Sequence, residues 1–162
     1  MTVTEPRATP AEPATPPPVL RTAATLWLAA VACGAFEAAL MAVTMLYDGV
    51  QVTDLLPGMG FRVAVFAGAA FLALRLRRGA NWARWTLTVT LGVFGTISLV
   101  KEPIEYLLAG GSIVEAVAGL DAVGWVFAAS RVLHVLAVAG ALTLMFQPRA
   151  NAYFRLAPVS TR

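Results

Sequence analysis

Four long apolar runs, separated by short polar segments, dominate the pattern of this chain. They cover about residues 22–46, 61–76, 82–100 and 123–146, and the second is the shortest. A helix of about 20 apolar residues crosses a hydrocarbon core about 30 Å thick. The pattern therefore predicts an all-α fold, a four-transmembrane-helix bundle that occupies residues 20–147.

The segments between the runs contain signals for helix ends. Pro57-Gly58-Met59-Gly60 precedes the second run, and Pro148 stops the fourth. Pro103 follows the third run, and we expect it to kink or end that helix because proline has no backbone N–H. Ser112-Ile113-Val114-Glu115 has the spacing of a capping box. It predicts a short interfacial helix over 113–119, in the third loop.

The two ends of the chain are polar. Residues 1–19 contain six prolines and no aromatic residue, so they cannot bury enough apolar surface to fold. We expect a disordered proline-rich cytoplasmic tail there, and a cytoplasmic juxtamembrane tail over 148–162.

Composition agrees with a membrane location. Hydrophobic residues make up 59% of the chain and charged residues 13%, with a mean hydropathy of +0.74, whereas about a quarter of the residues of a soluble domain are charged. The lipid bilayer is the expected partner. Eleven of the twelve basic residues are arginine and alanine is abundant, which is typical of a GC-rich bacterial gene. We therefore expect a multi-pass protein of a bacterial inner membrane.

The distribution of arginine predicts the orientation. Basic residues near span ends stay on the cytoplasmic side, and arginines cluster between the second and third runs and after the fourth: Arg75, Arg77, Arg78, Arg84, Arg149, Arg155 and Arg162. Both termini are therefore predicted to be cytoplasmic, and we expect Trp27, Trp82, Trp85 and Tyr153 at the same interface. The net charge of +3 follows from this topology and indicates no nucleic-acid partner.

Glu37, Arg131 and His134 lie inside apolar runs, where a lone charge costs about 2.5–3.5 kcal/mol. At about 1.5 Å per residue, Glu37 lies roughly 13 Å and Arg131 roughly 12 Å below the outer ends of their antiparallel helices. The matching depths predict an ion pair, and His134 lies on the same helix face as Arg131. This buried polar cluster has two interpretations: it fixes helix packing, or it carries a function.

Arg62, Glu102 and Glu105 lie nearer the outer side. They could line an outer vestibule that leads toward Glu37, with Arg62 paired to Glu102. Alternatively, they are interfacial charges that face lipid headgroups and water.

The sequence contains no recognisable catalytic set. His134 is the only histidine, so bis-histidine haem ligation fails, while a single axial ligand stays open. A metal beside Arg131 is electrostatically disfavoured. We expect no metal, no cofactor and no enzyme activity, and a structural or accessory membrane subunit with a membrane-protein partner or a homo-oligomer.

The alternative is a small proton-coupled or cation-binding transporter that uses Glu37. A glutamate in the first of four helices resembles the arrangement in small multidrug-resistance exporters. The chain departs from them in its long third loop, its proline-rich tail and Arg131, which would neutralise Glu37.

Two short segments resemble the boundary motifs of uncharacterised bacterial four-span integral membrane proteins. They are Arg78-Gly79-Ala80-Asn81-Trp82-Ala83-Arg84 and Pro148-Arg149-Ala150-Asn151-Ala152-Tyr153-Phe154. The resemblance extends loosely over about residues 20–156. It implies a fold and a membrane location, and it implies no activity. On physical grounds we expect both segments to be cytoplasmic anchors, with arginines facing lipid phosphates and aromatic rings at the interface.

Overall fold

The computed structural model describes residues 15–156, and within them every regular element is helical. In chain order the elements are α1 (Pro18–Tyr47), α2 (Val52–Arg77), α3 (Asn81–Leu87), η1 (Thr88–Gly95), α4 (Thr96–Leu108), α5 (Ile113–Ala118), α6 (Ala122–Met145) and α7 (Pro148–Leu156). The predictions for residues 1–14 and 157–162 lie outside the described residues.

Four continuous helical stretches are long and apolar enough to cross a membrane: α1, α2, the stretch from α3 through η1 to α4, and α6. The prediction of an all-α protein with four membrane-length helices is confirmed at this level. The capping box is also present, because Ser112 Oγ accepts from the Glu115 N–H at 3.1 Å and starts α5.

Three helix boundaries differ from the prediction. α1 begins at Pro18, inside the segment 1–19 that was predicted to be disordered, because proline is tolerated in the first turn of a helix. In the other two cases a helix contains a proline that was expected to lie outside it. α2 begins at Val52, nine residues early, and contains Pro57. The third stretch continues through Pro103 to Leu108. Each proline removes one backbone hydrogen bond and leaves the remaining helical bonds in place, which a membrane helix tolerates when other groups satisfy the freed carbonyl.

The middle of the third stretch is a π-helix, η1, which the sequence pattern did not predict. Its threonine hydroxyls donate hydrogen bonds to backbone carbonyls four residues earlier. Thr88 Oγ1 donates to Arg84 O at 2.8 Å, and Thr90 Oγ1 donates to Thr86 O at 2.7 Å. Such back-bonding competes with the regular helical ladder. π-helical turns are rare and concentrate at sites where a helix must adjust to its neighbours.

The helices pack tightly at one end of the molecule only. We call the end at which α1 begins and α6 finishes the closed end, and the opposite end the open end. The most deeply buried large side chains, Leu20, Trp27, Leu76, Leu87 and Met145, all lie toward the closed end. Trp27 Nε1 donates to Met145 Sδ at 3.3 Å, so the prediction that Trp27 lies at a membrane interface is wrong.

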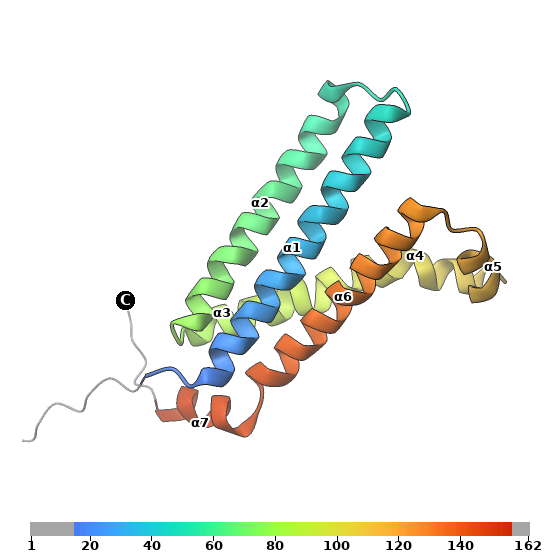
Figure 1. The fold of residues 1–162 in the computed structure, drawn as a ribbon. Helices are drawn as coiled ribbons and strands as arrows, with labels where there is room; N and C mark the ends of the chain where they lie inside the picture. The colour runs from blue at the N-terminus through green and yellow to red at the C-terminus, as the bar shows by residue number, and fades with distance from the viewer. Residues whose placement is uncertain (1–14, 157–162) are drawn as a thin grey trace, which may run out of the picture.

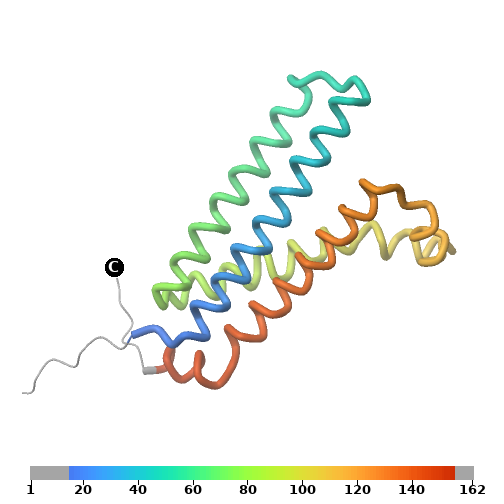
Figure 2. Tube along the Cα trace, viewed as in Figure 1, coloured from blue at the N-terminus to red at the C-terminus, as the bar shows by residue number. Residues whose placement is uncertain are grey.

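Toward the open end the helices separate into two arms. α1 packs against both α2 and α6, and Figure 1 shows α1 between them, with α4, α5 and the start of α6 turning away from the α1–α2 pair. Figure 2 shows the same divergence along the Cα trace. The molecule thus has a compact base and a divided opposite half.

The segment after Pro148 is helical, where the sequence analysis placed a tail. α7 returns to contact α1 and α6, and Ala150 is fully buried. Tyr153 of α7 lies directly over Gly79, in the turn between α2 and α3, where φ is +83°. Glycine is required at this position both by its φ and by the close approach of the tyrosine ring.

Gly79→Ala should lower the free energy of unfolding by about 1–2 kcal/mol from the left-handed backbone alone, and further because the new methyl group would meet Tyr153. Gly49→Ala is the matched control, since Gly49 has φ +87° with no neighbour within 4 Å. Unfolding in detergent, followed by circular dichroism, measures both. Equal losses in the two variants would show that the Tyr153 contact contributes nothing.

Candidate functional site

The buried polar cluster forms where α1 and α6 cross. Glu37 is 7% exposed, and its two carboxylate oxygens have different partners on α6. Oε2 lies 3.7 Å from Arg131 Nε, while Oε1 accepts a hydrogen bond from Ser130 Oγ at 3.1 Å. The structure thus brings Glu37 and Arg131 together at the common depth inferred from the sequence.

Arg131 also reaches the third membrane-length stretch. Its Nη1 donates to the backbone carbonyl of Leu99 in α4, at 3.4 Å. In a regular helix that carbonyl would accept from the N–H of residue 103, and residue 103 is proline. Arg131 therefore supplies a donor that Pro103 cannot, and its side chain links α1, α4 and α6.

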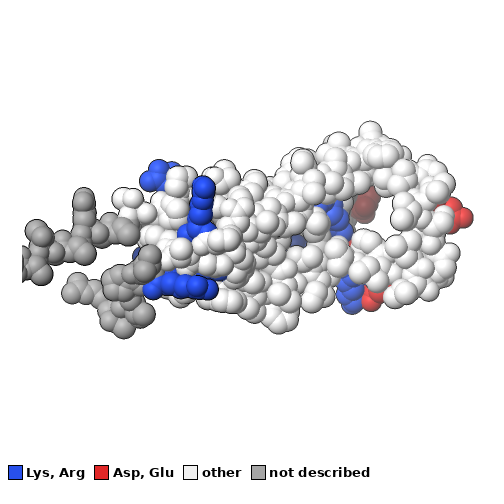
Figure 3. Space-filling model, turned by 90° about the horizontal axis from the view of Figure 1, so that it is seen from below, with Lys and Arg blue, Asp and Glu red and all other residues white. Residues whose placement is uncertain are grey.

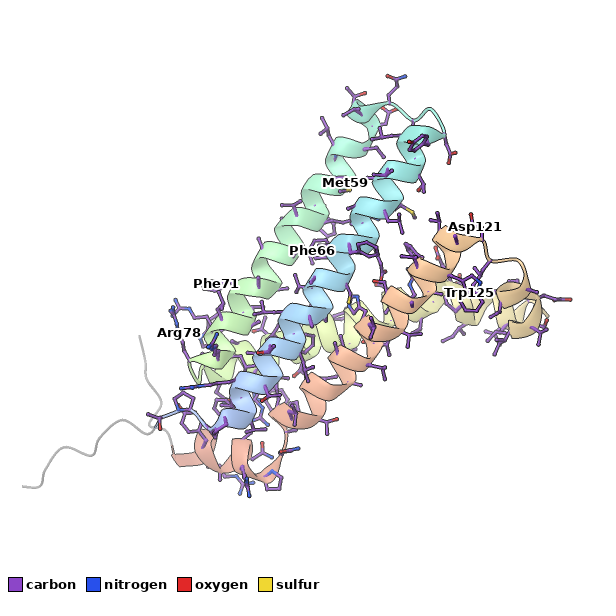
Figure 4. The ribbon with its side chains drawn as sticks, viewed as in Figure 1. Met59, Phe66, Phe71, Arg78, Asp121 and Trp125 are labelled. Carbon is purple, nitrogen blue, oxygen red and sulfur yellow. The ribbon has the colours of Figure 1, made fainter. Side chains whose placement is uncertain are left out.

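His134 lies about one turn along α6 from Arg131, near Gly34 of α1 and Phe66 of α2. A methyl group at Gly34 would lie 3.4 Å from the His134 ring and 3.1 Å from Phe66, the α2 residue labelled in Figure 4. The absence of a side chain at Gly34 makes room for both rings. Nδ1 of His134 is buried without a hydrogen-bond partner, so the imidazole neighbours the Glu37–Arg131 pair without joining its hydrogen bonds.

The three residues predicted to line an outer vestibule, Arg62, Glu102 and Glu105, do not lie together. Arg62 lines a cavity of about 290 Å³ between α1 and α2, together with Asp54. Glu102 lines another, of about 390 Å³, between α4, α5 and α6, with Arg131 on its wall. Glu105 is exposed and lies 3.7 Å from Lys101, one helical turn away. Within the described residues no ion pair joins Arg62 to Glu102, and the two line different cavities.

A further cavity, of about 340 Å³, separates α1 from α6 on the open side of the cluster. Its lining is apolar apart from Thr44 and Arg131. Figure 3 shows a hollow toward the end of the molecule away from the tails, with basic and acidic side chains at its edge. The guanidinium of Arg131 consequently stands between two cavities, although its carboxylate partner is buried.

Arg84 forms a second buried polar group, at the closed end. It is 5% exposed and Nη2 donates to Asn151 Oδ1, while Asn151 Nδ2 donates to Phe146 O at 2.8 Å. Its guanidinium carbon lies 4.1 Å from the centroid of Phe146 and 5.0 Å from that of Phe154. The expectation that this arginine faces lipid phosphates is wrong, because its charge is held by aromatic faces and an amide.

The sequence pattern did not predict roles for Ser130 and Asn151. The hydroxyls of Thr44, Thr86, Thr88 and Thr90 donate to carbonyls of their own helices, whereas the Ser130 hydroxyl donates to Glu37 on α1. The available signal was position, since Ser130 is adjacent to Arg131 in an otherwise apolar run. Asn151 lies in one of the two boundary segments, and its pairing with Arg84 shows that these segments contact each other.

The chemistry available at the cluster is limited by how fully it is occupied. Glu37 Oε1 accepts a hydrogen bond from Ser130, and Oε2 faces Arg131 Nε, which is 3.7 Å away and has no hydrogen-bond partner. Among residues 15–156, no group of three or more His, Cys, Asp or Glu side chains is placed to hold a metal ion. The arrangement is that of an ion pair without a direct hydrogen bond between its members, with an imidazole neighbour.

Comparison with protein-family models, curated proteins and solved structures gave no match to this chain. The resemblance of the two boundary segments to uncharacterised four-span proteins therefore stays a prediction.

Glu37→Gln and Arg131→Met should each destabilise the protein, because each leaves one buried charge without its partner. The double variant should be more stable than the summed single losses predict, by about 0.5–3 kcal/mol, since the two residues are in contact. Thermal unfolding in detergent of all four proteins gives this coupling. Glu105→Gln with Arg131→Met is the control pair, and it should be additive; additivity for Glu37 with Arg131 would exclude the ion pair.

Pro103→Ala tests the bond from Arg131 to Leu99. Alanine restores a backbone N–H for the Leu99 carbonyl, so the loss caused by Arg131→Met should shrink by about 1 kcal/mol, the net value of one hydrogen bond. Pro57→Ala, which removes a proline from α2, should leave that loss unchanged. The loss caused by Arg131→Met is measured from unfolding midpoints in the Pro103→Ala and Pro57→Ala backgrounds. An equal loss in both would mean that Arg131 does not replace the donor that Pro103 lacks.

Proposed function

We propose that this chain is a multi-pass bacterial inner-membrane protein that acts as a structural or accessory subunit, and that its Glu37–Arg131–His134 cluster fixes the helix packing. The observation that carries the proposal is the full engagement of Glu37. Its carboxylate lies 3.7 Å from a guanidinium, accepts from a serine and is 7% exposed. A group so held is suited to joining helices.

The electrostatic argument favours the same role. A buried charge without a partner is strongly destabilising, whereas a buried pair contributes little net stability and can specify one packing arrangement. Arg131 matches only a helix register that places Glu37 and the Leu99 carbonyl within reach. Sliding α1 or α4 by one residue would remove these partners, so the cluster selects one arrangement from several that apolar surfaces alone would accept.

The orientation that we propose places the closed end in the cytoplasm. Arg75, Arg77, Arg78 and Arg84 lie there at the end of α2 and in α3, together with the arginines of α7, and in Figure 3 acidic side chains are visible only toward the opposite end. Basic residues near span ends favour the cytoplasmic side.

Alkaline phosphatase fused after Arg162 should be inactive if the closed end is cytoplasmic. An active fusion would show that the proposed orientation is the wrong way round.

The membrane-facing surfaces fit an accessory role. Large apolar side chains remain exposed along every membrane-length stretch, for example Phe36, Phe71, Phe94 and Leu133. Such surfaces contact lipid or the helices of another membrane protein. We propose a membrane-protein partner or a second copy of this chain as the additional contact, with the bilayer covering the remainder.

Purification in mild detergent should recover the protein with a stoichiometric membrane-protein partner or as a homo-oligomer, identified by cross-linking and mass spectrometry. An apparent monomer without any partner would contradict the accessory role. Arg149→Gln removes a charge outside the cluster, so this variant should keep the partner bound.

Proton-coupled transport is the competing function, and reconstituted vesicles separate it from the structural role. The structural proposal expects the wild-type protein to carry no proton flux. Flux in the wild-type protein, abolished in a folded Glu37→Gln variant, would replace the accessory proposal with a transporter.

A further inference from the structure

Three methionines surround one cavity at the open end. Met41 and Met45 of α1 and Met59 of α2 line the space of about 290 Å³ between the two helices. Met145 is the other methionine among residues 15–156, and it lies in the closed-end core, where it accepts the hydrogen bond from Trp27. The thioethers of the described chain are thus concentrated at one position.

The backbone places these three side chains so that their sulfurs can converge. Met41 and Met45 are one helical turn apart on the same face of α1. Met59 is seven residues into α2 and Met41 is six residues before the end of α1, so in this antiparallel pair both lie roughly 10 Å from the connecting loop, at about 1.5 Å per residue. Figure 4 shows Met59 on the side of α2 that faces α1.

Methionine often fills irregular gaps in a core, but here the three side chains border a cavity. Met41 and Met45 are 48% and 36% exposed, in contrast to the fully buried Met145. Flexible side chains around an open space can rearrange about a guest.

The charges around the cavity leave it close to neutral. Asp54 and Arg62 also line it, and apolar or glycine positions complete the wall. The carboxylate offsets the guanidinium, so a monovalent cation can enter without facing a net positive charge. A hard divalent cation would find only one carboxylate there, whereas oxygen-rich ligand sets are what such ions require.

We infer that this cavity binds Cu(I) through the thioether sulfurs of Met41, Met45 and Met59. Thioethers are soft neutral ligands, and soft sulfur ligands select Cu(I) among the common biological metals. Unlike thiolate and imidazole, a thioether has no proton to lose before it binds. Binding should therefore be independent of pH over the range in which cysteine and histidine sites weaken on acidification. The inference does not depend on the accessory role proposed above.

The experiment titrates the full-length protein in detergent with Cu(I), kept reduced by ascorbate, against a chromogenic Cu(I) chelator. We expect one equivalent bound at pH 7.5 and at pH 5.5. The variant carrying Met41→Leu, Met45→Leu and Met59→Leu should lose that equivalent, because leucine keeps the apolar volume and removes the sulfur. Circular dichroism establishes that this variant retains its helices.

Two controls identify the ligands. Met145→Leu removes a methionine outside the cavity, and Cys33→Ala removes the only thiol; both should still bind one equivalent. X-ray absorption should show sulfur neighbours around the copper. Absence of binding by the wild-type protein, an unchanged triple variant, or loss in Cys33→Ala would each overturn the thioether site.

Discussion

The packing of the helices toward the open end depends on the partners of one guanidinium. Within a hydrocarbon core there is no water to satisfy a backbone carbonyl, so every such group must find its donor inside the protein. Pro103 deprives the Leu99 carbonyl of its helical donor, and Arg131 reaches across from α6 to replace it. The same side chain faces Glu37 on α1. Three helices are thereby joined through one residue.

The two ends of the molecule use different means of association. At the closed end, alanines such as Ala23, Ala73 and Ala141 are fully buried, and small residues let helix backbones approach closely enough for dispersion forces to act. At the open end the arms diverge, one cavity lies between them, and two more lie within the arms. Apolar packing holds the base, while specific polar bonds hold the divided half.

The sequence predicted the parts of this structure that follow from length and depth. Four membrane-length helices follow from apolar runs, and the proximity of Glu37 and Arg131 follows from counting residues along antiparallel helices. Whether a proline ends a helix or lies inside it did not follow from the sequence. Pro57 and Pro103 lie inside helices whose other hydrogen bonds compensate for them. Trp27 and Arg84 were misplaced because their residue types favour interfaces, whereas burial here depends on Met145, Asn151 and aromatic neighbours that only the fold brings together.

The order of dependence within the cluster bears on what Glu37 can do. Pro103 creates an unsatisfied carbonyl, and Arg131 satisfies it. The partly buried charge of Arg131 is in turn paired with the Glu37 carboxylate, which also accepts a hydrogen bond from Ser130. Removing the Glu37 carboxylate would leave Arg131 without its counter-charge while its guanidinium still donates to Leu99. A charge inside a protein that has lost its partner is destabilising. The contacts of Glu37 and the contact that holds α4 therefore depend on the same arginine, which is the arrangement expected of a residue that joins helices.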